Sequence, residues 1–177
     1  MSAEKLLEDI RRHWEKVLHP PEDPYKYDND LAAEFAGFAV FNWGDGFAYG
    51  KCHPYEILCH PGRFAQPGSK AEDQALVRQL GGRRVSVLLK LSAVLPYYLV
   101  KLLCREYNGD EPVERDASPE NDLQKDVFAR AVRFAESRGF KPIPEDDLEK
   151  LVPGALLELA APGTVTVYNC LFEDQSN

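Results

Sequence analysis

The chain has 177 residues, of which 44% are hydrophobic and 28% charged, and its formal net charge is −8 at pH 7. This length is typical of one domain with a substantial core, and the composition is that of a folded protein rather than a disordered chain. The negative charge argues against a nucleic-acid-binding protein, because neutralising phosphates requires an excess of lysine and arginine.

The first predicted element is an amphipathic helix over residues 3–18, whose apolar side chains recur at helical spacing. Pro20 and Pro21 end this helix, since proline cannot continue it. A loop over residues 19–30 leads to a short helical turn over residues 31–36.

A β-hairpin is predicted next. Its strands cover residues 38–43 and 47–51, and its turn covers residues 44–46, where Asp-Gly favours the backbone of a tight turn. A third strand is expected over residues 55–59.

A second helix is predicted to start at a capping box. Ser69 and Glu72 have the spacing in which the serine accepts from a backbone amide and the glutamate reaches back to the serine's own amide. This helix runs to Leu80 and ends at Gly81 and Gly82, where a left-handed backbone costs least.

The densest apolar stretch covers residues 85–107 and predicts the centre of a sheet. We expect two neighbouring antiparallel strands, residues 85–91 and 97–107, joined near Leu95 and Pro96. A continuous helix is the rival interpretation, but Pro96 would remove a backbone donor and clash with the preceding turn.

The last third begins with a polar loop over residues 108–117. Ser118 then caps a long helix that Gly139 ends, a short acidic helix covers residues 145–152, and a closing strand covers residues 164–172. The buried face of the long helix is expected to hold Leu123, Val127, Phe128, Ala131, Val132 and Ala135.

Together these elements predict an α+β fold. We expect residues 1–177 to form a single domain, with a mostly antiparallel sheet of about five or six strands and helices packed on one face.

The negative charge is concentrated in the C-terminal part. Residues 1–107 carry 14 acidic and 14 basic side chains, whereas residues 108–177 carry 15 acidic and 7 basic ones, which accounts for the whole −8. Such a distribution is typical either of a solvated surface or of a face that attracts a basic partner. The candidate partner-binding residues are Asp110, Glu111, Glu114, Asp116, Asp146 and Asp147.

We expect a cytoplasmic protein. The N-terminus lacks the basic and apolar regions of a signal peptide, and Lys90 and Lys101 interrupt the only stretch long enough to suggest a membrane span. Four cysteines without a secretory signal are most simply reduced thiols.

The tripeptide Cys-His-Pro occurs twice, at residues 52–54 and 59–61. Thiols and imidazoles suit zinc, but neighbouring side chains of a strand face opposite ways, and the two cysteines would lie about 20 Å apart. We therefore predict no metal site and no cofactor. If the segment folded back, the ligands would be Cys52, His53, Cys59 and His60.

No catalytic residues are predicted. A Cys–His nucleophile needs a thiol of lowered pKa, whereas Cys104 and Cys170 fall in predicted core strands. No Ser-His-Asp spacing and no phosphate-binding loop is present.

The leading functional hypothesis is a non-enzymatic module that binds a basic protein through its acidic C-terminal half. A bacterial immunity protein that inhibits a toxic enzyme would have this profile, which is an analogy of profile alone. The alternative is a small enzyme or ligand-binding protein with a pocket built from Trp43, Asp45, Tyr97 and Tyr98 together with His53 or His60. A structural or scaffolding domain is the third possibility.

Overall fold

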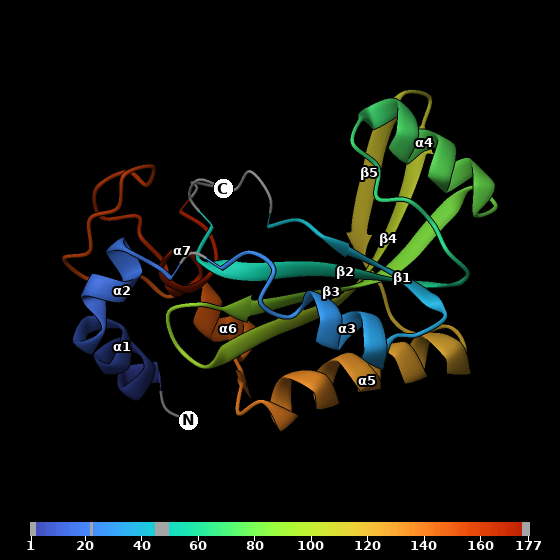
Figure 1. Ribbon diagram of the computed structural model, residues 1–177. Coiled ribbons are helices and arrows are strands. Elements are labelled where there is room, and N and C mark those ends of the chain that lie inside the picture. Colours follow the sequence, from blue (N-terminus) through green and yellow to red (C-terminus); the bar gives the residue numbers. More distant parts are fainter. Residues whose placement is uncertain (1–2, 22, 45–49, 175–177) are drawn as a thin grey trace.

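An antiparallel sheet forms the centre of the structure, and its first five strands lie side by side in chain order (Figure 1). This computed structural model describes residues 3–21, 23–44 and 50–174. The strands are β1 (Phe38–Asn42), β2 (Cys52–Pro61), β3 (Arg83–Ser92), β4 (Tyr97–Asn108), β5 (Glu111–Asp116) and β6 (Lys141–Pro142). The short β6 pairs in parallel with the start of β4.

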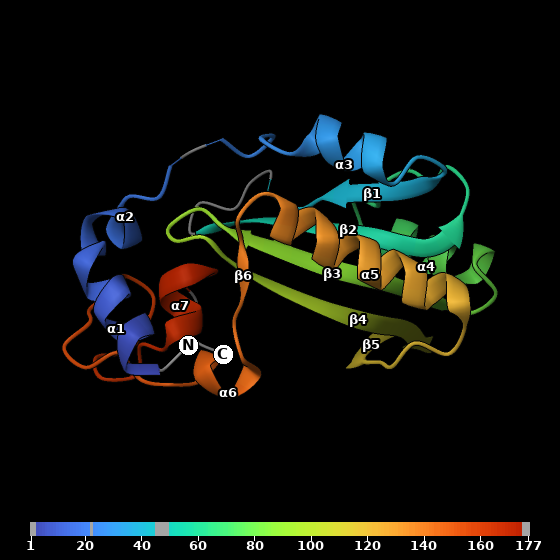
Figure 2. The ribbon, with the colours of Figure 1, turned by 90° about the horizontal axis from the view of Figure 1, so that it is seen from below.

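Helices cover both faces of this sheet. They are α1 (Ala3–Arg12), α2 (Trp14–Leu18), α3 (Asp28–Glu34), α4 (Lys70–Gln79), α5 (Asp122–Ser137), α6 (Glu145–Leu148) and α7 (Val167–Leu171). Helices α3 and α5 lie on one face and α4 on the other, while α1, α2, α6 and α7 gather at one end (Figures 1 and 2). The predicted α+β fold with its mostly antiparallel sheet is confirmed, although α4 occupies the face opposite α5.

Strand alternation assigns the side chains to the two faces. Ile57, Val87 and Leu89 are fully buried beneath α3 and α5, where the largest core cluster forms. Their neighbours Glu56 and Arg84 point to the other face and are also buried. Strands β2 and β3 are therefore covered on both sides, which explains their nearly continuous apolar sequence.

The two central strands were predicted correctly. β3 and β4 pair antiparallel from Arg83 opposite Glu106 to Leu91 opposite Tyr98. The chain passes between them through residues 93–96, as the position of Pro96 indicated.

The closing strand predicted over residues 164–172 is wrong, because this segment contains helix α7 instead. Thr166 accepts from the backbone N–H of Asn169, and the Asn169 side chain accepts from the N–H of Thr166, which completes a capping box. Val167 and Leu171 are fully buried in the cluster formed with α1 and α6. The β-branched residues thus pack in a helix that its cap initiates, and tertiary burial outweighs their strand propensity.

The polar loop predicted over residues 108–117 is also wrong in part, since it contains β5. All six residues of this strand are exposed, so it lacks the apolar alternation by which a strand is recognised. This segment forms a strand because its backbone pairs with β4.

Several element boundaries differ from those predicted. Helix α5 starts after an Asn121 cap rather than at Ser118, and Leu123 is 37% exposed instead of buried. The first helix is divided at His13 into α1 and α2. Glu72 accepts from the N–H of Gly68 instead of completing the predicted capping box.

The predicted hairpin has a different partner strand. β1 pairs with β2, from Phe38 opposite Pro61 to Asn42 opposite Tyr55. Most of the turn and second strand predicted over residues 44–51 falls at positions 45–49, outside the described residues. No helix within the described residues is long and apolar enough to cross a membrane.

Candidate functional site

The predicted acidic face separates into two parts in the structure. The first lies along β5, where three carboxylates pair with cations from the N-terminal part of the chain. Their closest N···O distances are 3.4 Å for Glu111–Lys70, 2.6 Å for Glu114–Arg105 and 2.9 Å for Asp116–Lys101. Although β5 is exposed, this pairing reduces the negative potential that it presents to a partner.

The second part begins at α6. Asp146 is exposed and forms no ion pair with any described residue. Asp147 is only 6% exposed and pairs with Lys150, so its inclusion in an exposed binding face is a correction to the sequence analysis.

Exposed leucines lie among the acidic residues that follow α6. Leu151, Leu156 and Leu159 are 54%, 66% and 39% exposed, and they come from a segment that contains five acidic residues and one basic residue. We refer to residues 145–159 as the acidic leucine segment. An isolated exposed leucine is unremarkable on a protein surface, but three within nine residues among carboxylates form a candidate interface.

Buried residues of the same segment fix its backbone. Val152 and Leu157 lie in the core cluster with α1 and α7, and the Val152 N–H donates to the Val165 carbonyl at 2.8 Å. At the other end, the Glu158 N–H donates to the Asp174 carboxylate at 3.2 Å. The exposed leucines therefore belong to a segment whose backbone is held in place by buried side chains and hydrogen bonds.

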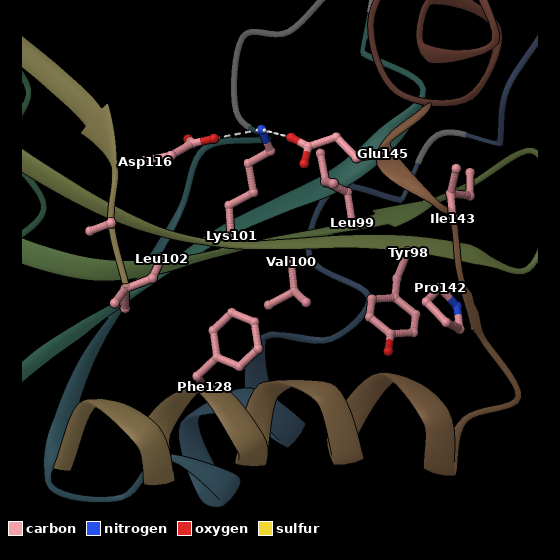
Figure 3. Close-up of a pocket in the computed structure, with 11 residues that line it drawn as sticks. Tyr98, Leu99, Val100, Lys101, Leu102, Asp116, Phe128, Pro142, Ile143 and Glu145 are labelled. Carbon is pink, nitrogen blue, oxygen red and sulfur yellow. Dashed lines mark hydrogen bonds and ion pairs between the residues drawn. The ribbon is translucent and has the colours of Figure 1, made fainter. Parts of the chain in front are cut away.

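A cavity of about 370 Å³ lies beside the middle of β4 (Figure 3). One wall is formed by the side chains of Tyr98, Val100 and Phe128, which lie between β4 and α5. The cavity is also lined by Ala117, which follows β5, and by Ile143, which follows β6.

A lysine spans the opposite wall of this cavity. Lys101 Nζ lies 2.9 Å from Asp116 Oδ2 and 2.8 Å from Glu145 Oε1 (Figure 3). Its hydrogen bonds to Glu145 and Asp116 raise the pKa of Lys101 above its ordinary value. Both carboxylates remain largely exposed, with side chains 64% and 72% accessible, so that they are available to another cation.

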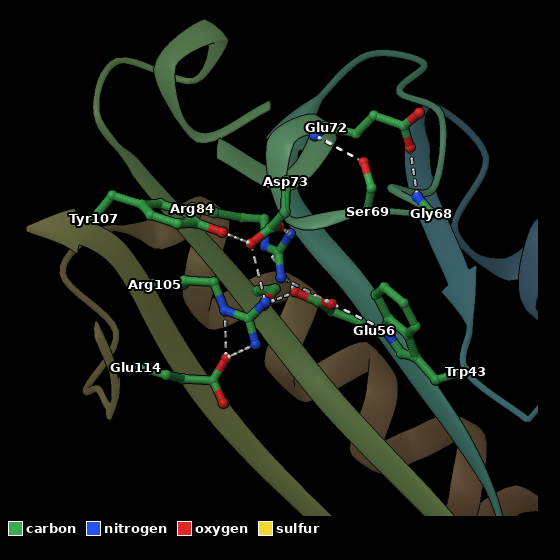
Figure 4. Close-up of polar contacts among 11 residues, drawn as sticks. Trp43, Glu56, Gly68, Ser69, Glu72, Asp73, Arg84, Arg105, Tyr107 and Glu114 are labelled. Atoms are coloured by element: carbon green, nitrogen blue, oxygen red, sulfur yellow. Dashed lines mark hydrogen bonds and ion pairs between the residues drawn. The ribbon is translucent and has the colours of Figure 1, made fainter. Parts of the chain in front are cut away.

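A buried ionic cluster lies between α4 and the sheet (Figure 4). Arg84 is 1% exposed and pairs with Glu56 of β2 and Asp73 of α4. Glu56 also accepts from the Trp43 indole at 3.0 Å and from the Ser86 hydroxyl at 2.7 Å. Its carboxylate is therefore surrounded by donors from β3 and from the residue that follows β1.

The carboxylate of Asp73 is likewise surrounded by donors from the protein. It accepts from Arg105 at 3.1 Å and from the Tyr107 hydroxyl at 2.6 Å, in addition to Arg84 (Figure 4). Carboxylates saturated with protein donors have little capacity left for a substrate or a proton transfer. We infer that this cluster attaches α4 to the sheet. This cluster was not predicted from the sequence. The charged residues Glu56 and Arg105, which fall within strands predicted to be buried, are the sequence feature that indicates it.

The two Cys-His pairs do not converge. Cys59 is buried beneath α5, whereas Cys52 lies on the opposite face near Lys90 and Glu173. His60 accepts from the Val85 N–H at 3.2 Å through Nε2. Across the described ranges, no group of three His, Cys, Asp or Glu side chains has an arrangement suited to a metal ion.

The thiols lack the features of a nucleophile. Burial raises the pKa of Cys52, Cys59 and Cys170 to about 12, and it also raises the pKa of Cys104. A reactive thiol requires the opposite shift.

The residues of the alternative pocket are placed apart. Tyr98 lines the β4 cavity, whereas His53 lines a different one of about 370 Å³ with Tyr27 and Phe140. Trp43 donates to Glu56 beneath α4, and Asp45 lies outside the described residues. Tyr97 is 4% exposed and belongs to the cluster with α1.

Comparison with known proteins gives no match: no family model fits this sequence, and no curated protein or solved structure is similar to it.

Proposed function

We propose that this protein is a non-enzymatic binding module that recognises a basic protein through the acidic leucine segment, residues 145–159. The observation that carries the proposal is the exposure of Leu151, Leu156 and Leu159 beside unpaired or exposed carboxylates on an anchored backbone. An inhibitor of the immunity type, which masks a toxic enzyme, is one class of protein with these properties.

The leucines would supply affinity. Complete burial of a leucine side chain contributes about 1.5–3 kcal/mol, and interface energy is typically concentrated in a few such residues. Leu156, the most exposed large apolar side chain among the described residues, is the expected centre of the contact.

The carboxylates would orient the partner and raise the rate of association. Asp146 and Glu149 are exposed and lack ion pairs within the described part of the chain, so their fields extend into solvent. A basic rim on the partner would be steered toward them, which raises the association rate more than the affinity.

The test is capture from a lysate of the native host with wild-type and variant protein. The double variant Leu151→Ser/Leu156→Ser removes the apolar contact, and Leu123→Ser is a matched control because Leu123 is an exposed leucine at the start of α5. In Figure 2 that helix end lies at the opposite end of the sheet from α6.

A basic protein retained by wild type and by Leu123→Ser, but lost from the double variant, supports the proposal. Retention of the same protein by all three would show that the acidic leucine segment is not the binding surface.

A further inference from the structure

The edge of β4 is open over a short length at its middle. β5 pairs with β4 from Leu103 onward, and β6 pairs only with Tyr97 and Tyr98. Residues 99–102 therefore lie between two neighbouring strands, and the cavity of about 370 Å³ is located at this interruption (Figure 3).

The backbone of Val100 points into this opening. The carbonyls of Tyr98 and Leu102 accept from the N–H groups of Ile143 at 3.3 Å and Ala117 at 2.8 Å, so both face away from β3. Peptide groups of alternate residues in a strand point to the same side, which places the N–H and C=O of Val100 on that side as well. Within the described residues, neither group has a backbone partner there.

The walls of the cavity differ in character on the two faces of the sheet. On the α5 side are the apolar side chains of Val100 and Phe128, with the Tyr98 ring. On the other side are Asp116 and Glu145, which share Lys101 between them.

We propose that this opening binds an extended segment of the basic partner as an added strand, antiparallel to β4. The inference rests on the proposed function and names the binding mode of that partner. The residue opposite Val100 would be apolar and would pack toward Phe128, and the residues on either side of it would be lysine or arginine facing Asp116 and Glu145.

The antiparallel direction follows from the size of the opening. In an antiparallel pair, one residue forms both of its backbone hydrogen bonds with the single residue opposite it. In a parallel pair, the N–H and C=O of one residue bind two different residues of the partner strand. Val100 offers both an N–H and a C=O inside the cavity without a backbone partner among the described residues. About 13 Å of strand separates the neighbouring strands, which suits a segment of three residues. The volume is within the usual range for ligand pockets, about 300–1,000 Å³.

The test uses three capped tripeptides added to the isotope-labelled full-length protein and followed by NMR. The first is acetyl-Lys-Val-Lys-amide. The second carries an N-methyl group on valine, which removes the donor to the Val100 carbonyl. The third carries it on the last lysine, whose N–H would point away from β4 and therefore serves as the matched control.

We expect the first and third peptides to bind with similar millimolar affinity, to shift the Val100 and Lys101 amides and to slow exchange of the Val100 N–H. The second peptide is expected to bind at least about tenfold more weakly. Equal affinity for all three, the reverse methylation pattern, or no saturable shift at these amides would overturn the inference.

A protein variant tests the charged wall separately. Asp116→Asn/Glu145→Gln should weaken acetyl-Lys-Val-Lys-amide by about three- to tenfold, whereas Glu111→Gln, which changes an exposed carboxylate of β5 outside the cavity, should not. Unchanged affinity in the double variant would contradict recognition of basic side chains. These results do not depend on lysate capture, so failure of the strand addition and failure of the proposed function are distinguishable.

Discussion

Arg84 of β3 and Asp73 of α4 form an ion pair in which both side chains are buried, although they come from elements on either side of a glycine turn. Helix α4 buries few apolar side chains, chiefly Leu76 and Val77. Its attachment to the sheet therefore depends on this pair and on the contacts that Arg105 and Tyr107 make to the same carboxylate.

The first prediction concerns Asp73. Asp73→Asn would remove one of the two carboxylates that pair with the buried Arg84 guanidinium and would leave Arg105 without its buried partner. We expect the free energy of unfolding to fall by about 3 kcal/mol. Glu114→Gln is the matched control, because it removes a carboxylate of the same network whose side chain is 40% exposed, and its cost should be about 1 kcal/mol or less. Urea unfolding of both variants provides the measurement, and equal losses would refute a special role for the buried pair.

The second prediction concerns acid stability. Burial, assisted by nearby Arg83, lowers the pKa of His60 below its ordinary value of 6.5. Since the unfolded chain then takes up the proton first, stability is complete above about pH 6.5 and declines as the pH falls below it. His60→Gln should reduce this decline between about pH 7.5 and about pH 5.

Part of the acid dependence should remain in His60→Gln, because burial also lowers the pKa of His53. An unfolding free energy with the same pH dependence in wild type and His60→Gln would exclude the assigned titration.

The third prediction concerns the cysteines. With the pKa of Cys52, Cys59 and Cys170 raised to about 12 by burial, the native protein should react slowly with a thiol reagent at about pH 8. All four thiols should react rapidly once the chain is unfolded in urea. Rapid labelling of any one of them in the native protein would show an activated thiol that this structure does not contain.

The sequence predicts the centre of the fold better than its edges. β3 and β4 were identified because their apolar residues are dense and Pro96 excludes a continuous helix. α7 was missed because Val167 and its neighbours favour strands, while the Thr166–Asn169 capping box, which a sequence search can detect, starts a helix. β5 has no such local signal, since only its register with β4 defines it.

The candidate site was predictable in composition but not in arrangement. The charge count located the acids after residue 107, and Asp146 is indeed exposed. That Glu114 pairs with Arg105, however, depends on which residues the register of β4 and β5 places opposite one another. The sequence alone could not separate the paired acids of β5 from Asp146 and Glu149, which form no ion pair with any described residue.

The central claim is that binding is steered by residues 145–159 rather than by Asp110 and Glu111 at the start of β5. The most direct test measures the association rate of the captured partner at low and at high salt for two charge-reversed proteins. Asp146→Lys/Glu149→Lys changes the acidic leucine segment, and Asp110→Lys/Glu111→Lys introduces the same charge change beside β5. We predict that the first variant associates at least about tenfold more slowly than wild type at low salt and loses most of its salt dependence, while the second retains most of both. Equal effects of the two variants, or a larger effect beside β5, would contradict the account.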